Sequence, residues 1–379
     1  MTRGSDVVVV GAGVIGLAVA WRAVQRGLSV VVVDPDPGAG ASVVAAGMLA
    51  PVTELHYTER ALLDLTLAAA AAYPDFVAEL ESATGHDVGY RRCGTVSVGW
   101  MGSDLAGLRE VAEFQRSLGL DVEMLTAAEL RRLEPLLAPG LPGGTLVLGD
   151  HQVDPPRLVA ALAAANTAAG VATVVGRAAS FVPDGDRVSG VRLADGSAIV
   201  ATQTVLACGA RSAALELPDG SALPVRPVKG QTLHLHGEPG RLTHVVRGEV
   251  RGVPVYVVPR DDGRIVVGAS SEESGFDTRP RAGAVHDLLR DAQSLFPLVA
   301  EMEFVEVRTG LRPGTPDNAP LLGPVGVDGL VIATGHYRNG VLLAPVTADG
   351  IADLLQSGTT PQSWSPFDPM RFSLKPAWN

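Results

Sequence analysis

The sequence predicts an α/β fold in which a Rossmann-type dinucleotide-binding domain is interleaved with a second domain, built on a mostly antiparallel sheet with helices. The first 34 residues are typical of a strand, a glycine-rich turn, a helix and a second strand. Strand and helix patterns alternate again after residues 144 and 308, whereas residues 225–267 contain short strands divided by turns. At 379 residues the chain also exceeds the size at which one hydrophobic core usually stops growing.

The expected division follows these patterns, because no internal repeat or long linker separates the parts. We expect the dinucleotide-binding domain to comprise residues 1–85, 145–222 and 308–365, the second domain 86–144 and 223–307, and a C-terminal tail 366–379. Helices are expected at 58–84, 105–133, 156–170, 283–295 and 341–355. Strands are expected at 89–100, 144–153, 171–175, 187–193, 198–207 and 330–333, with a hairpin about Asp262-Gly263.

The first unit carries a dinucleotide fingerprint. A β-branched run at residues 7–10 is typical of a strand buried on both faces, and Gly11-Ala12-Gly13-Val14-Ile15-Gly16 then opens a helix. Gly11 permits the tight turn, Gly13 lets a pyrophosphate approach the backbone, and Gly16 lets the helix pack closely. Phosphate charge meets free N–H groups at the positive end of the helix dipole. A glycine turn without a ligand is the competing interpretation, which the surrounding strands and helix disfavour.

An acidic residue completes the fingerprint. Asp34 ends the second strand 23 residues after Gly11, near the spacing expected for a carboxylate that binds the ribose. A carboxylate there would repel a 2′-phosphate. The fingerprint therefore leaves NAD or FAD, and cannot choose between them.

Composition excludes several classes. The net charge of −11 has the wrong sign for non-specific nucleic-acid binding. Two cysteines, Cys93 and Cys208, are too few for a disulfide framework and lack metal-ligand spacing, so we expect no metal and a cytoplasmic location. We see no signal peptide, and apolar stretches such as residues 65–72 fall short of a membrane span of about 20 residues.

Two small-residue segments favour FAD. Residues 40–51, Gly-Ala-Ser-Val-Val-Ala-Ala-Gly-Met-Leu-Ala-Pro, resemble the stretch that runs beneath the flavin in the D-amino-acid oxidase and glycine oxidase family. Residues 205–210, Val-Leu-Ala-Cys-Gly-Ala, resemble the strand-to-glycine turn by which these flavoproteins approach the dinucleotide again. Ser42 can hydrogen-bond the pyrophosphate. Cys208 is expected to be a small buried residue, not a nucleophile.

Two C-terminal segments are more specific to the family. Residues 309–317, Thr-Gly-Leu-Arg-Pro-Gly-Thr-Pro-Asp, and 335–345, Gly-His-Tyr-Arg-Asn-Gly-Val-Leu-Leu-Ala-Pro, resemble its glycine oxidases, particularly those that supply the thiazole branch of thiamine biosynthesis. With the N-terminal motifs, the resemblance extends over nearly the whole chain. It implies non-covalent FAD, an amino-acid substrate, O2 and a homotetramer.

The resemblance implies four residues for the substrate. Arg312 would hold the carboxylate, because a planar guanidinium donates two parallel hydrogen bonds and stays protonated. Tyr256 would reach the same carboxylate, Arg338 would lie between them and the flavin edge, and Met48 would line the cavity. No residue is assigned as a catalytic acid or base, and His336 is expected to pack or to hydrogen-bond.

The cofactor residues implied by the resemblance lie in the glycine turn, the small-residue segments and the C-terminal turn, where Gly340 opens a helix that could stabilise negative charge on reduced flavin. They are Gly11, Gly13, Val14, Ile15, Gly16, Asp34, Pro35, Ser42, Val43, Ala46, Gly47, Met48, Leu49, Ala179, Ala207, Gly209, His336, Tyr337, Arg338, Asn339, Gly340, Val341 and Leu342.

Simpler interpretations remain open for single residues. Arg312 alone could be a structural ion-pair arginine, and Tyr256 alone a half-buried strand residue; Arg260 and Arg308 are interpreted as surface or structural charges. Pro254 stands where the family's glycine oxidases often have a histidine. Ser270 or Ser271 stands near the place of a methionine, which puts the pocket shape in doubt.

The function expected from the resemblance is oxidative deamination of glycine, with sarcosine or small D-amino acids as further substrates. The carboxylate would be clamped, hydride would pass from Cα to FAD, and O2 would become H2O2. A D-amino-acid dehydrogenase or a sarcosine or other secondary-amine oxidase is the nearest alternative. A non-catalytic FAD-binding module and an NAD-dependent dehydrogenase are alternatives from other classes.

Overall fold

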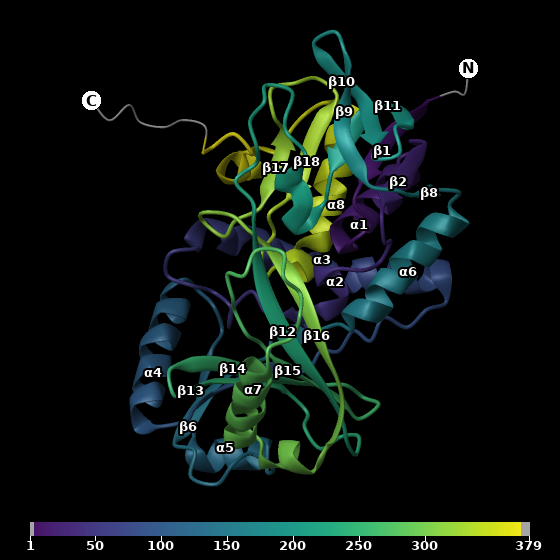
Figure 1. Ribbon diagram of the computed structural model, residues 1–379. Coiled ribbons are helices and arrows are strands. Elements are labelled where there is room, and N and C mark those ends of the chain that lie inside the picture. Colours follow the sequence, from purple (N-terminus) through teal and green to yellow (C-terminus); the bar gives the residue numbers. More distant parts are fainter. Residues whose placement is uncertain (1–3, 373–379) are drawn as a thin grey trace.

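The computed structural model, which describes residues 4–372, contains two eight-stranded sheets that occupy opposite ends of an elongated molecule (Figure 1). In the first sheet the strand order is β17-β18-β11-β1-β2-β8, and β9 and β10 extend it as an antiparallel ribbon beside β11. Its strands are β1 (Ser5–Val10), β2 (Val30–Asp34), β8 (Ala172–Val175), β9 (Ala178–Asp184), β10 (Arg187–Leu193), β11 (Ala198–Leu206), β17 (Leu321–Pro324) and β18 (Leu330–Thr334).

The first sheet is parallel at its centre and buried on both faces. β1 pairs in parallel with β2 and β11, and β11 in parallel with β18. Because side chains alternate along a strand, Val7 and Val9 face one core cluster while Val8 and Val10 face another. The helices α1 (Val14–Gln25), α3 (Arg60–Thr84), α6 (Pro155–Ala168) and α8 (Gly340–Ser357) contribute to the first cluster.

The helix α3 passes the length and hydropathy test for a membrane span, unlike every other described helix. A buried core helix has the same length and composition, so its surroundings decide its role. Its side chains Leu62, Ala69 and Phe76 are buried in the cluster that also contains α1, α6 and α8. We conclude that α3 is a core helix.

The second sheet has the order β16-β12-β15-β14-β13-β4-β6-β5 and is antiparallel except where β13 pairs with β4. The predicted fold class, a Rossmann-type α/β domain with a mostly antiparallel partner, is thus confirmed. The strands are β4 (Thr95–Gly99), β5 (Glu123–Thr126), β6 (Gly143–Val147), β12 (Arg226–His236), β13 (Val245–Val250), β14 (Val253–Pro259), β15 (Arg264–Gly268) and β16 (Glu303–Gly314). Their helices are α4 (Gly102–Ser117), α5 (Ala127–Leu133) and α7 (Ala282–Leu295).

Smaller elements connect the two sheets. The short helix α2 (Ala41–Val44) leads to β3 (Met48–Leu49), which pairs with β7 (His151–Gln152). The long strands β12 and β16 run side by side from the second sheet toward the first (Figure 1). Three short 3-10 helices lie along the described part of the chain: η1 (Gly209–Ala214), η2 (Pro297–Glu301) and η3 (Gln362–Phe367).

Several expectations about single elements need correction. The stretch 105–133 was expected to be helical, but β5 lies inside it and pairs with β6. The strand β9 was not expected. The hairpin about Asp262-Gly263 is confirmed, since β14 and β15 pair on either side of it and Gly263 has a φ of +86°. The division into domains stays a prediction, and its boundaries at 144/145 and 307/308 fall within β6 and β16.

Candidate active site

The glycine turn packs too closely for any side chain. Gly11 has a φ of +114°, and a Cβ there would lie 2.3 Å from the carbonyl oxygen of Ala207. A Cβ at Gly16 would lie 1.8 Å from the Gly11 oxygen. At Gly13 the nearest atom would be Ser42 Oγ, at 3.1 Å. The first and third glycines are therefore required by packing, and the second leaves its backbone open to a ligand.

Two polar side chains flank this turn. Ser42 Oγ accepts a hydrogen bond from Val14 N at 3.0 Å, so its own hydrogen is free for a phosphate oxygen. Asp34 accepts from Ala12 N at 2.7 Å and from Asp36 N at 2.8 Å. These bonds fix the carboxylate at the end of β2, beside the N-terminus of α1. The arrangement suits a ribose hydroxyl next to a pyrophosphate.

Most of the other cofactor candidates surround this turn or continue from it. Pro35 follows β2, and Val43, Ala46, Gly47, Met48 and Leu49 belong to the α2–β3 segment. Ala207 and Gly209 follow β11. His336, Tyr337, Arg338, Asn339, Gly340, Val341 and Leu342 form the turn between β18 and α8 and the start of that helix. The expectation that Gly340 opens a helix is confirmed.

Ala179 does not join this group. It is exposed on β9, which pairs with β10. The register partner of Asp34 on β8 is instead Val175, and Gly176 N donates to the Asp34 carbonyl at 3.0 Å. The end of β8 therefore contacts the ribose acid, whereas Ala179, the residue that sequence reasoning selected, lies on the next strand.

Replacing Asp34 by alanine is expected to weaken FAD binding about tenfold, since a hydrogen bond to a charged acceptor is lost. Titration of the apoprotein with FAD, followed by flavin fluorescence quenching, measures the change. Asp36→Ala is the matched control, because its exposed carboxylate lies two residues away and receives no backbone hydrogen bond from the glycine turn. Equal FAD affinity in the Asp34 variant and the wild type would refute the ribose assignment.

Arg312 lies near the end of β16, over the backbone of the neighbouring strand. A Cβ on Gly230 of β12 would lie within 2.6 Å of three atoms of its guanidinium. Its Nη1 donates to the carbonyl of Ser270 at 3.1 Å. Among residues 4–372 no carboxylate forms an ion pair with it. A half-buried guanidinium without a counter-charge is stabilised when an anion binds beside it.

Tyr256 meets Arg312 from β14. The two side chains interact electrostatically, and burial raises the pKa of Tyr256 to about 12. The ring lies over Gly268 of β15, where a Cβ would be 2.3 Å from the hydroxyl oxygen. The structure thus brings the two predicted carboxylate ligands together. Sequence reasoning missed the two glycines beneath them, although a glycine within a strand does signal a close approach.

Met48 lies beside this pair. It packs with Tyr256 against an apolar cluster of Ala46, Cys93, Val245, Val258 and Val266. The cluster joins the α2–β3 segment to the inner face of β14 and β15. Met48 therefore lies on the side of Tyr256 that faces the α2–β3 segment.

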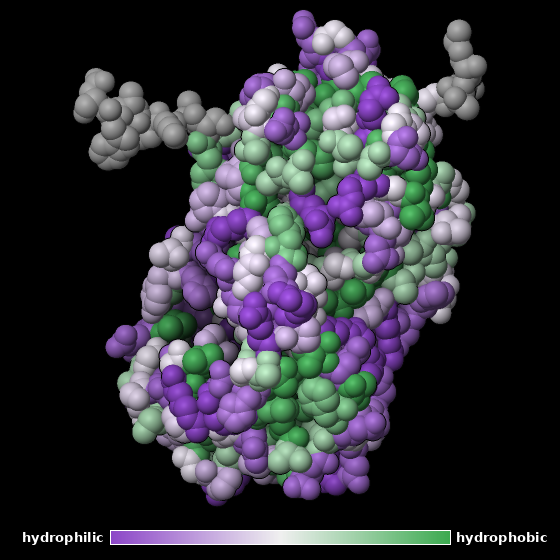
Figure 2. Space-filling view, viewed as in Figure 1, coloured by the Kyte–Doolittle hydropathy of each residue, from purple (hydrophilic) through white to green (hydrophobic). Residues whose placement is uncertain are grey.

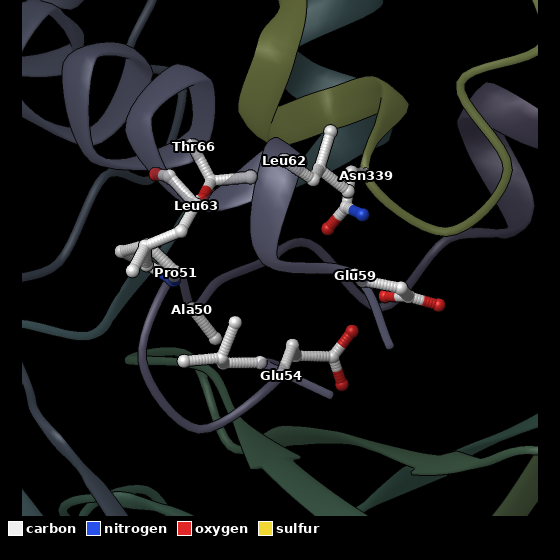
Figure 3. A pocket seen from close by; sticks show the side chains of 9 residues that line it. Ala50, Pro51, Glu54, Glu59, Leu62, Leu63, Thr66 and Asn339 are labelled. Atoms are coloured by element: carbon white, nitrogen blue, oxygen red, sulfur yellow. Dashed lines mark hydrogen bonds between the residues drawn. The ribbon is translucent and has the colours of Figure 1, made fainter. Parts of the chain in front are cut away.

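The side chain of Arg338 forms ion pairs that the sequence did not predict. It forms ion pairs with Glu54 and Glu59, and Arg247, the register partner of Tyr256, donates to Glu54 at 2.8 Å. Both glutamates line a small pocket between the β3–α3 connection and the start of α8 (Figure 3). The two arginines lower the pKa of Glu54 against its burial. Sequence reasoning missed this charge-balanced group, because no spacing pattern connects its members.

The remaining candidate residues make contacts that suit structural roles. Burial lowers the pKa of His336 to about 3, and its Nε2 lies 3.1 Å from Thr347 Oγ1, which agrees with a neutral hydrogen-bonding role. Arg308 pairs with Glu306 and donates to Val43 O at 3.1 Å. Arg260 is only 6% exposed, so it is a structural and not a surface charge.

Burial also sets the state of Cys208. Its Sγ donates to Val10 O at 3.3 Å, and burial raises the pKa of the thiol to about 12. Cys208 is partly buried, and its protonated thiol agrees with the expectation that it is not a nucleophile.

These features fit FAD. Three features suit the binding of a dinucleotide. The turn excludes side chains at Gly11 and Gly16, Ser42 can donate its hydroxyl hydrogen, and hydrogen bonds fix the carboxylate of Asp34. A second sheet presents an unbalanced cation next to that fold, which defines the class as a flavoprotein oxidoreductase with an anionic substrate group. The chain matches the DAO family model, FAD dependent oxidoreductase, over residues 6–354, and it belongs to this family.

Known relatives resemble the chain over its whole length. It is 36% identical over 370 residues to the glycine oxidase of Geobacillus kaustophilus, covering 97% of both chains. It is 36% identical to the bifunctional protein ThiO/ThiG of Trichormus variabilis, covering 98% of this chain and 55% of that longer protein. The crystal structure of the Geobacillus kaustophilus glycine oxidase matches with a TM-score of 0.91 and 34% identity, covering 98% of this chain and 99% of that one.

Proposed function

We propose that this protein oxidises the amine of a small amino acid, with glycine first and sarcosine or small D-amino acids as further substrates. The observation that carries the proposal is the unbalanced guanidinium of Arg312, which interacts with Tyr256 beside a dinucleotide-binding fold. The similarity to glycine oxidases supports the same substrate class. The products would be the imino or oxo acid and H2O2.

The residues of this chain would bind and orient the substrate. Arg312 would bind the carboxylate through two parallel hydrogen bonds, and Tyr256 would donate a third. Held at this end, the substrate has its Cα directed toward the cofactor side of the cavity, where Met48 limits its size. Bound FAD supplies the two-electron acceptor for the Cα–H bond and passes those electrons to O2. Positioning would therefore provide most of the acceleration that the protein contributes.

The proposed hydride transfer needs no side chain that acts as a base at Cα. The turn before α8 carries one imidazole, that of His336. Its Nε2 lies 3.1 Å from Thr347 Oγ1, and its pKa of about 3 leaves it neutral. The hydroxyl of Tyr256 stays protonated, since its pKa lies at about 12. The proposed reaction accordingly needs the substrate amine in its neutral form, and activity should rise with pH as the substrate ammonium ionises.

Replacing Tyr256 by phenylalanine is expected to lower kcat/KM about tenfold, because one hydrogen bond to a charged carboxylate is lost. A tyrosine with a pKa of about 12 does not ionise below pH 10, so the variant should keep the pH profile of the wild type. Steady-state peroxide assays between pH 6 and 10 measure both quantities. A changed profile would show that the hydroxyl takes part in proton transfer.

Anaerobic bleaching of the flavin by glycine, sarcosine and D-alanine tests the proposal directly, and peroxide output in air ranks the three. A D-amino-acid dehydrogenase would reduce a dye but form little peroxide, and a secondary-amine oxidase would prefer sarcosine. A non-catalytic FAD-binding module would not bleach with any of them. A protein that does not bleach with any amino acid would refute the proposal.

Further features of the proposal rest on the relatives. Delivery of the product to thiazole synthesis is supported by the similarity to the ThiO/ThiG protein. We also propose non-covalent FAD, a homotetramer and a cytoplasmic location. Denaturation of the holoprotein, which would release free FAD, and light scattering, which would give the mass, test the first two.

A further inference from the structure

Strand β14 presents three side chains to the cofactor side of the second sheet. Because alternate residues share a face, Tyr256, Val258 and Arg260 point the same way, although Arg260 lies just beyond the end of the strand. Tyr256 and Val258 contact the apolar cluster that contains Ala46, and Arg260 reaches the same segment. One strand thus serves both the substrate pocket and the segment beneath the proposed flavin position.

Arg260 is an unusual buried cation. It is 6% exposed, and burial lowers its pKa to about 10, so it remains charged at neutral pH. Its Nη2 donates to Ala46 O at 2.6 Å and its Nη1 donates to Gln152 Oε1. Both partners are neutral. Asp154, the closest carboxylate, forms its ion pairs with Arg264 and Arg157, and no ion pair of Arg260 occurs in the described part of the chain.

The bond from Arg260 fixes one peptide group. In a planar trans peptide the N–H points opposite to the C=O, so the N–H of Gly47 points away from Arg260. Gly47 is buried, its carbonyl accepts from Val153 N at 2.9 Å, and a Cβ on it would lie 2.0 Å from Val153 O. Its N–H has no acceptor among residues 4–372. Buried N–H groups without acceptors are rare, which indicates a ligand at this point.

The preceding carbonyls are held by the same sheet. Arg308 of β16 donates to Val43 O at 3.1 Å, and Thr232 of β12 donates to Val44 O at 3.2 Å. Each hydrogen bond therefore connects a carbonyl of the α2–β3 segment to the second sheet. Arg260 differs from Arg308 because it is buried, and the peptide that it holds carries the Gly47 N–H, which has no acceptor among residues 4–372.

We propose that Arg260 is a positioning residue for FAD: it holds the Ala46–Gly47 peptide so that the Gly47 N–H donates to the flavin ring. A hydrogen bond to the ring, together with a buried positive charge behind the peptide, stabilises the electron-rich reduced form. The inference rests on the FAD site and not on the substrate, so it can fail while the proposed function holds.

Arg260→Met, which keeps the apolar stem, is expected to raise the FAD dissociation constant about tenfold. The visible absorption bands of the FAD that still binds should shift, and its reduction potential should fall. Fluorescence titration of the apoprotein, absorption spectra and equilibration with a reference dye measure these quantities without any substrate. Arg260→Lys, which keeps the charge but not the two-pronged contact, should give the same changes to a smaller degree.

Arg264→Met is the matched control. It lies in the same turn and leaves the buried Asp154 without its closest partner, so it should lower the melting temperature and leave the flavin spectrum unchanged. A purely structural role for Arg260 would give this same pattern in Arg260→Met and would overturn the proposal. Should Arg260→Met not fold, Arg260→Lys decides: a shifted spectrum supports the proposal, and an unshifted spectrum with wild-type FAD affinity overturns it.

Discussion

Replacing Arg312 by alanine is expected to leave FAD bound while kcat/KM for glycine falls about a thousandfold. The guanidinium contributes no ion pair to the fold of residues 4–372, and it donates a hydrogen bond to the Ser270 carbonyl. Its removal should therefore cost little stability. The visible spectrum of the purified variant reports bound flavin, and peroxide assays report turnover.

The control for this prediction is Arg279→Ala, which removes an arginine whose side chain is 85% exposed. It should keep wild-type kinetics. Wild-type turnover by the Arg312 variant would mean that the substrate carboxylate binds elsewhere, even if the protein is an amino-acid oxidase.

Gly230→Ala is expected to lower kcat/KM about a hundredfold, because a displacement of a binding group by about 1 Å can have that effect. The new Cβ would lie 2.5 Å from Arg312 Nη1, and the flexible end of that side chain can move aside. The fold and FAD binding should consequently be preserved. Kinetics with glycine, together with thermal unfolding, separate a displaced guanidinium from a damaged sheet.

A double variant sharpens this prediction. In the Arg312→Ala background, Gly230→Ala should have no further effect on kcat/KM, because residues that act as one unit are not additive. Gly314→Ala, a glycine of the same strand pair that a Cβ would bring 3.0 Å from Val228 Cγ2, is the control. Equal losses from Gly230→Ala in both backgrounds would show that Gly230 acts through the sheet and not through Arg312.

The glycine turn and the acid after β2 could be predicted from the sequence, because their function depends on local spacing. Gly11, Gly16 and Asp34 all lie in one βαβ unit, where each role follows from backbone geometry. Strand and helix patterns also predicted the two kinds of sheet. The strand β5 was missed because it is four residues long and lies between two helices.

The substrate side depended on resemblance, since its residues come from distant parts of the chain. Arg312 and Tyr256 lie on strands β16 and β14, which are separated in the sheet by β12 and β15. No periodicity could bring them together, or place Gly230 and Gly268 beneath them. The ion pairs of Arg338 with Glu54 and Glu59 likewise depend on the tertiary fold, so the sequence could not predict them.

The surface drawn in Figure 2 mixes hydrophilic and hydrophobic residues over both ends of the molecule. Of the two sulfhydryl groups of the chain, that of Cys93 belongs to a buried residue and that of Cys208 to a partly buried one. Cys93 is buried against the amide of Gln152, and Cys208 is almost wholly protonated at neutral pH because its pKa is about 12. Oxidants attack the thiolate, not the thiol. A protein that releases hydrogen peroxide with each turnover would thereby be protected from inactivation by its own product.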